Sequence, residues 1–239
     1  MIEPPRTPAA PLLDNVLDEL GRDIVSGALP EGKTFTLQDL SNRFDISRTV
    51  AREVMRALEQ LGLVSSSRRV GITVRPRSSW AVFDQAIIDW RLASPSERRL
   101  QLRSLSELRS GVEPQAARLA AAAATTVQRE ELASLAARMR ELGESGEGSS
   151  PEFLEADVRF HALLLEASGN EMFAALAPSM LSVLHGRTRY GLQPAAPAPE
   201  ALTAHEELAR AIADGDESGA EQQSRALLTE AAQFFISDF

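Results

Sequence analysis

Hydrophobic residues recur every three or four positions along nearly the whole chain, which is the spacing of amphipathic α-helices. The pattern is interrupted only by short polar stretches and, near residue 70, by two brief apolar runs that are too short for helices. In the first third the predicted elements are a helix, a short helix, a longer helix and a pair of strands, over residues 12–26, 37–44, 45–63, 63–64 and 72–74.

From residue 96 onward every segment has helical spacing. The six predicted helices cover residues 96–124, 127–143, 151–168, 171–190, 200–214 and 217–237, and a further helix over 80–92 precedes them. Short loops favour antiparallel neighbours. We therefore expect a mostly α fold, in which an N-terminal winged helix-turn-helix is followed by an all-α antiparallel bundle of about six to seven helices.

Composition shifts predict four divisions of the chain. The proline-containing start has no periodicity and is expected to be a disordered tail. The divisions are a tail at 1–11, a winged helix-turn-helix at 12–75, a linker with a connecting helix at 76–95, and an effector-binding and dimerisation domain at 96–239.

The helix predicted over 45–63 has one apolar seam and one basic face. Ser47 is placed to cap it, and Gly62 to end it. The polar face carries Arg48, Thr49, Arg52 and Arg56, and the turn of the hairpin carries Arg68 and Arg69. An ordinary surface helix with solvated arginines is the alternative, but a basic helix beside a basic wing is typical of DNA binding.

Charge is distributed unevenly along the chain. The net charge is −9, yet residues 40–79 hold 8 basic and 3 acidic side chains. Binding to phosphates needs a local basic surface rather than a basic protein. The sequence contains no cysteine, no long apolar run and no signal-peptide pattern, so we expect a cytoplasmic protein with no membrane segment.

Several polar residues lie on otherwise apolar helix faces of the predicted bundle. Asp157 and His161 are one turn apart, and His205 lies on a later helix. A carboxylate and imidazoles can ligate one divalent cation or bind one ligand, although satisfied buried histidines are the alternative. Arg109 lies among leucines and suits bidentate binding of a carboxylate, unless it forms a salt bridge with Glu113 one turn on.

The N-terminal part resembles the winged helix-turn-helix of GntR-type bacterial transcription factors. The residues that carry the resemblance are IVSGALPEGKTF at 24–35, DISRTVAREVMRALEQLGLV at 45–64 and GITVRPR at 71–77. The resemblance implies binding to a double-stranded DNA operator. Arg48 and Arg52 are expected to contact base edges, and Thr49, Arg56, Arg68 and Arg69 to contact phosphates or the minor groove.

The remainder resembles the all-helical FCD effector domain of the FadR branch of that family. The matching strings are SELRSGVEPQAARLAA at 106–121, ADVRFHALLLEASGN at 156–170 and AHEELARAIADGD at 204–216. Many relatives bind a metal through one Asp and three His. Asp157, His161 and His205 match three of these ligands, whereas the fourth position is Leu227, with Gln223 one turn earlier as a poor substitute.

The resemblance is greatest to members that sense sugar acids such as galactonate. It implies a homodimeric repressor, not an enzyme, that a small carboxylate releases from a palindromic operator. Arg109, Asp157, His161 and His205 would bind that effector, and a divalent metal (Zn, Ni or Mn) would be held by the last three. A metal-dependent hydrolase with a DNA-binding module and a regulator that senses an acyl group are the alternatives.

Overall fold

The computed structural model describes residues 9–237, and it describes the side-chain surroundings of residues 12–229. These residues form two compact units, one up to residue 101 and one from residue 102 onward. The predicted tail falls largely outside the described residues, and the first helix begins at Ala9, three residues before the predicted start. None of the described helices is long and apolar enough to cross a membrane.

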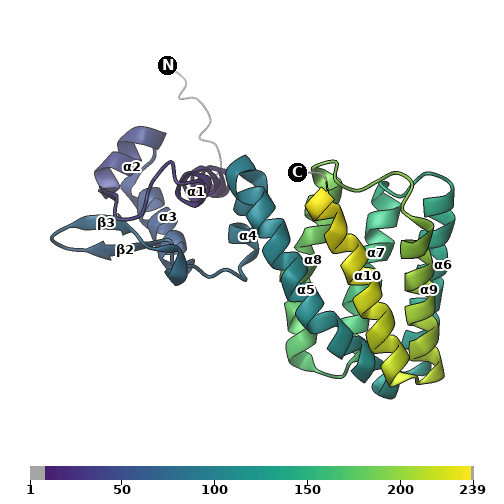
Figure 1. Cartoon of the computed structure of the whole chain (residues 1–239). Coiled ribbons are helices and arrows are strands. Elements are labelled where there is room, and N and C mark those ends of the chain that lie inside the picture. The colour runs from purple at the N-terminus through teal and green to yellow at the C-terminus, as the bar shows by residue number, and fades with distance from the viewer. Residues whose placement is uncertain (1–8, 238–239) are drawn as a thin grey trace. The chain divides into compact units, whose positions relative to one another are not determined.

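The first unit is a winged helix-turn-helix (Figure 1). Its elements are α1 (Ala9–Val25), β1 (Thr34–Phe35), α2 (Leu37–Phe44), α3 (Arg48–Gln60), β2 (Val64–Ser67), β3 (Gly71–Val74), a 3-10 turn η1 (Arg77–Ser79) and α4 (Gln85–Ala93). The strands form an antiparallel sheet in the order β1-β3-β2. Leu20, Val54 and Leu58 are among the residues of its buried core.

Local capping sets the start of α2 and of α3. Thr36 and Asp39 form a reciprocal capping box at α2. Asp45 adopts a left-handed conformation (φ 51°) that ends α2, and the Ser47 hydroxyl accepts a hydrogen bond from the backbone N–H of Val50. The predicted cap Ser47 is confirmed, and within the predicted range of 45–63 the helix covers Arg48–Gln60. The two-residue strand β1 was not predicted, because it is too short to show alternation.

The connecting helix is shorter than predicted. Its expected start at residue 80 is wrong, because Asp84 caps α4 by accepting from the backbone N–H of Ala86. Trp80 and Phe83 therefore precede the helix. Trp90 is buried against α1, where a Cβ atom on Gly21 would lie 2.5 Å from the indole ring, and its Nε1 donates to Asp18 at 2.9 Å. The helix thus belongs to the core of the first unit.

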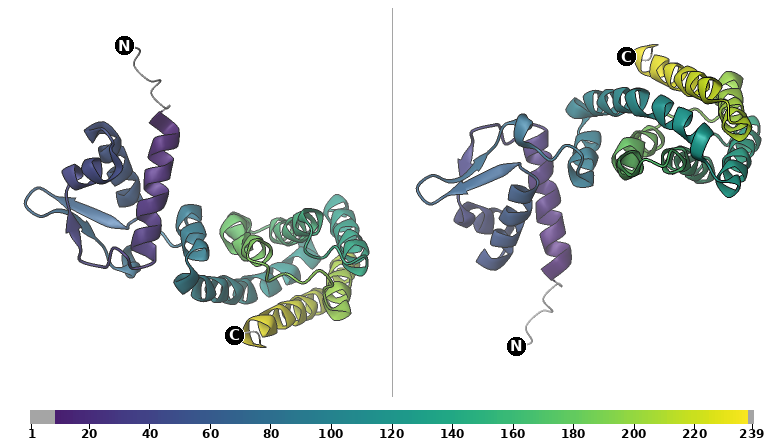
Figure 2. Two further views of the ribbon diagram at one scale, coloured as in Figure 1. Left: turned by 90° about the horizontal axis from the view of Figure 1, so that it is seen from above. Right: turned by 90° about the horizontal axis from the view of Figure 1, so that it is seen from below.

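The second unit is an all-α bundle, which Figure 2 shows from above and from below. Its helices are α5 (Pro95–Ala123, which begins in the first unit), α6 (Thr126–Glu144), α7 (Pro151–Ala167), α8 (Glu171–Arg189), α9 (Pro199–Asp214) and α10 (Glu217–Ser237). Helix α6 packs against α7 and α9, α7 against α8, and α9 against α10. Every predicted boundary lies within one residue of the observed one, which confirms the predicted bundle.

Candidate functional site

The first candidate site is a groove between α3, the start of α2 and the wing, which we call the recognition groove. It is about 490 Å³ in volume, and Arg48, Arg52 and Arg68 all line it. All six side chains predicted to contact DNA are exposed. The fold therefore brings basic residues from positions 48–52 and from the wing onto one surface, as phosphate binding requires.

Two of the arginines predicted to contact DNA, Arg48 and Arg56, have side-chain partners. Arg48 Nη2 donates to Gln38 Oε1 at 2.9 Å, and Gln38 Nε2 donates in turn to Asn42 Oδ1. Arg56 Nη1 lies 2.7 Å from Glu53 Oε1, which offsets its charge. Gln38 was missed by the sequence analysis, because a polar residue in the first turn of α2 resembles any other exposed helical residue. It holds Arg48 in place through a neutral contact that leaves the arginine charge intact.

The second candidate site is a cavity inside the bundle, which we call the ligand cavity. Its volume is about 130 Å³. All four predicted effector-binding residues line it: Arg109 from α5, Asp157 and His161 from α7, and His205 from α9. Arg187 of α8 and Leu227 of α10 line it too, whereas Gln223 is not among its lining residues.

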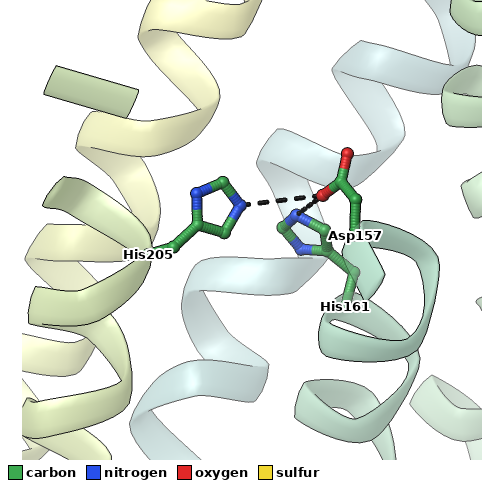
Figure 3. Close-up of side chains that lie close together, drawn as sticks. All are labelled: Asp157, His161 and His205. Atoms are coloured by element: carbon green, nitrogen blue, oxygen red, sulfur yellow. Dashed lines mark ion pairs between the residues drawn. The ribbon is translucent and has the colours of Figure 1, made fainter. Parts of the chain in front are cut away.

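Asp157, His161 and His205 converge on one point, as Figure 3 shows. Asp157 Oδ1 lies 3.2 Å from His161 Nε2 and 3.6 Å from His205 Nε2. The three ligand atoms all lie within 4.8 Å of one another, and all three residues are buried. Metal–ligand bonds of about 2.1 Å in a tetrahedron place two ligand atoms about 3.4 Å apart. The two distances from Asp157 Oδ1 therefore match the spacing of ligand atoms around a small divalent cation.

The hydrogen bonding of His205 also fits a cation. Its Nδ1 lies 2.8 Å from the backbone carbonyl of Ala201, so the proton of the neutral ring is on Nδ1. Nε2 is then a lone-pair donor that faces a carboxylate, and it is buried without a hydrogen-bond partner among the described residues. Lone pairs of His205 and Asp157 directed at each other repel unless a positive charge lies between them. The residues present therefore fit a divalent cation.

Glu113 on α5 contacts His161, one of the three residues of this cluster. Its carboxylate accepts from Arg109 Nε and from Arg109 Nη2 (3.3 Å), and Oε2 lies 2.8 Å from His161 Nδ1. The ring nitrogen is not aligned for a hydrogen bond, so this is a close ion-pair contact. The salt bridge between Arg109 and Glu113 is present, yet Arg109 also lines the ligand cavity. The two interpretations of Arg109 are therefore compatible.

The electrostatics of the ligand cavity follow from burial and close pairing. Burial alone would raise the pKa of Glu113, but the charges of Arg109 and His161 outweigh it and lower that pKa to about 2. Burial likewise opposes ionisation of Asp157, whereas the contact with His161 lowers its pKa well below the usual range. Both carboxylates are therefore ionised at neutral pH. Burial lowers the pKa of Arg187. This residue was not predicted to line the cavity, because it lies on a separate helix, α8.

The segment between α8 and α9 forms one wall of the ligand cavity through Gln193, Pro194 and Pro197. Gly148 holds this wall from the α6–α7 loop. Its backbone N–H donates to the Ala195 carbonyl at 2.7 Å, and a Cβ atom there would meet Pro197 Cδ at 2.3 Å. Only glycine permits so close an approach.

Gly148→Ala is therefore expected to displace the wall and to weaken binding of any ligand in the cavity by about tenfold, which corresponds to about 1.4 kcal/mol. Isothermal titration calorimetry with an acid that binds in the cavity would measure the affinity of each variant. Gly111→Ala is the matched control, because nothing lies within 4 Å of a Cβ atom there. Equal affinities for the two variants would contradict a role of the wall.

Comparisons with known proteins agree with both parts of the structure. Residues 12–74 match the family model of bacterial regulatory proteins of the gntR family, and residues 104–230 match that of the FCD domain. The galactonate operon transcriptional repressor of Escherichia coli (strain K12) is 31% identical over 219 residues, which cover 90% of this chain and 93% of that protein.

Two further proteins are similar. The uncharacterized HTH-type transcriptional regulator YieP of the same organism is 29% identical over 169 residues, covering 70% of this chain and 72% of YieP. Lar, described as controlling the expression of the Listeria monocytogenes agr system, shares the fold with a TM-score of 0.62 at 15% identity, covering 99% of this chain and 100% of its own. The chain belongs to the GntR family of bacterial transcriptional regulators and carries the FCD domain.

Proposed function

We propose that this GntR regulator is a homodimeric repressor in the cytoplasm, and that a sugar acid releases it from a palindromic operator with the help of a divalent cation. The observation that carries the proposal is the ligand cavity, in which an arginine and a cation-sized Asp–His cluster face the same space. The 31% identity to a galactonate operon repressor supports a sugar acid as the effector.

The chemistry of a sugar acid suits the lining of the cavity. Its carboxylate would pair with the guanidinium of Arg109, which planar anions bind bidentately. Its hydroxyl groups would approach the Asp–His cluster of Asp157, His161 and His205. A bound divalent cation would supply a positive centre that orients carboxylate and hydroxyl oxygens. Arg187 adds a second positive charge to the lining, so the cavity favours an anion.

Two copies of the recognition groove, related by a two-fold axis, would read two half-sites of an operator. Effector binding would favour a dimer geometry whose half-site spacing no longer matches DNA. Such a ligand can act only through its different affinities for the two states. An effector with an acyl chain is a weaker candidate, because four charged or imidazole side chains (Arg109, Asp157, His161 and His205) line the cavity.

Thermal unfolding tests the proposal. Chelator-treated protein is heated with each of a panel of sugar acids, with and without Zn²⁺, Ni²⁺ or Mn²⁺. A ligand that binds the native state at 100 times its Kd stabilises it by about 2.7 kcal/mol. We expect the largest rise in the unfolding midpoint when one acid and one metal are present together. Unchanged midpoints with every acid would refute the sugar-acid effector.

Arg109→Gln is expected to leave operator binding unchanged and to abolish release by the acid. The glutamine cannot pair with a carboxylate as an ion, and it leaves the buried Glu113 without its arginine, so thermal unfolding must first show that the variant is folded. Fluorescence anisotropy of a labelled operator, with the acid titrated in, measures both properties. Normal release of the variant by the acid would show that Arg109 does not bind the effector carboxylate.

A further inference from the structure

Glu113 lies between the two groups that the proposed function assigns to the effector and to the cation. Its side chain is fully buried, on the face of α5 that carries Arg109 one turn earlier. The carboxylate accepts from two nitrogens of Arg109 and contacts His161 Nδ1 at 2.8 Å. His161 in turn presents Nε2 to Asp157 in the Asp–His cluster. One carboxylate therefore contacts both halves of the ligand cavity.

The single negative charge of Glu113 serves two positive partners. A buried carboxylate needs close compensation, because leaving it unpaired is costly. When an anionic ligand approaches Arg109, it competes with Glu113 for the guanidinium, and Glu113 then interacts more strongly with His161. A stronger interaction at Nδ1 makes Nε2 a better electron-pair donor, as carboxylates behind metal-binding histidines commonly do.

Cation binding at His161 would in turn affect Arg109. A cation at Nε2 would withdraw electrons from the ring of His161 and so strengthen the electrostatic attraction between Nδ1 and the Glu113 carboxylate. The carboxylate then holds Arg109 less tightly, which leaves the guanidinium more available to an incoming anion. We propose that Glu113 is a positioning residue that couples the two events, so that carboxylate binding at Arg109 and cation binding at the Asp–His cluster strengthen each other. This inference rests on the proposed function.

Thermodynamic linkage requires that the coupling between the two ligands be reciprocal. If galactonate raises the affinity for Zn²⁺ by some factor, Zn²⁺ must raise the affinity for galactonate by the same factor. Couplings between sites are typically about 5- to 150-fold. We therefore expect galactonate to tighten Zn²⁺ binding to the wild-type protein by at least about fivefold.

The test measures Zn²⁺ affinity of the full-length protein by competition with a chelating dye, with and without saturating galactonate. Glu113→Gln is expected to weaken Zn²⁺ binding by about 10- to 100-fold, the usual cost of losing a carboxylate behind a metal-binding histidine. Its coupling factor should fall well below the wild-type value, because only the direct attraction between the cation and the acid then remains. Glu113→Asp keeps the buried charge that pairs with Arg109, so this variant should retain more of the coupling than Glu113→Gln does.

Glu97→Gln is the matched control. Glu97 is also a buried carboxylate paired with an arginine, Arg91, but it lies outside the ligand cavity. It should keep the wild-type coupling. Wild-type coupling in Glu113→Gln, or binding of both ligands to the wild type without coupling, would overturn the inference alone. Failure of the wild type to bind galactonate and Zn²⁺ would instead overturn the proposed function.

Discussion

Asp157→Asn is expected to weaken divalent-cation binding by about 100-fold or more, because losing a direct ligand should exceed the 10- to 100-fold cost of losing a supporting carboxylate. Asp157 Oδ1 is the atom shared by both histidine contacts, at 3.2 Å and 3.6 Å, so its charge is central to the cluster. An amide is a poorer ligand and carries no charge. The same variant should lose release by the acid while it retains operator binding.

Calorimetric titration of Zn²⁺ and anisotropy with a labelled operator measure the two effects separately. Glu155→Gln, an exposed position on the same helix, provides the control for a simple loss of negative charge from α7. A cation affinity of Asp157→Asn equal to that of Glu155→Gln would place the cation elsewhere in the protein.

Arg48→Ala/Arg52→Ala is expected to reduce operator affinity by at least about 30-fold. Each arginine that reads a guanine contributes about 1–3 kcal/mol, and losses at separate base contacts add approximately. Both side chains line the recognition groove, and Arg48 is held there by Gln38. The variant should also bind altered operators almost as well as the correct one.

Arg138→Ala is the control for this prediction, because Arg138 is an exposed arginine on α6 with one ion pair to Glu141. Arg69→Ala is the contrast: loss of a phosphate contact lowers affinity for all sequences alike and reduces the salt dependence by about one counterion. Undiminished sequence specificity in Arg48→Ala/Arg52→Ala would show that these arginines bind only the DNA backbone.

Most of the fold could be predicted because its helix ends are local. Ser47, Ser150 and Asn170 each accept a backbone hydrogen bond at a helix start, and Gly215 ends α9 with a φ of 74°. Such signals are present in the sequence itself. The predicted start of α4 was wrong because the aromatic residues before the helix have the spacing of an apolar helix face. The helix begins only after Asp84, which caps it.

The candidate sites were predictable to a lesser degree. Asp157 and His161 share a helix face through their spacing alone, but the approach of His205 from another helix depends on tertiary packing. Arg187 enters the same cavity from α8, and Glu113 joins Arg109 to His161. The pairing of Arg109 with Glu113 follows from their spacing on α5, whereas the position of Arg187 and the contact of Glu113 with His161 depend on how separate helices meet.

The central claim is that an acid and a cation in the ligand cavity control DNA binding. The most direct measurement uses a labelled operator, selected from random duplexes by the protein itself, and follows its anisotropy while galactonate is added to chelator-treated protein with and without Zn²⁺. We predict release from the operator at the lowest galactonate concentrations when Zn²⁺ is present. A complex that stays fully bound at every concentration, with or without Zn²⁺, would contradict the claim.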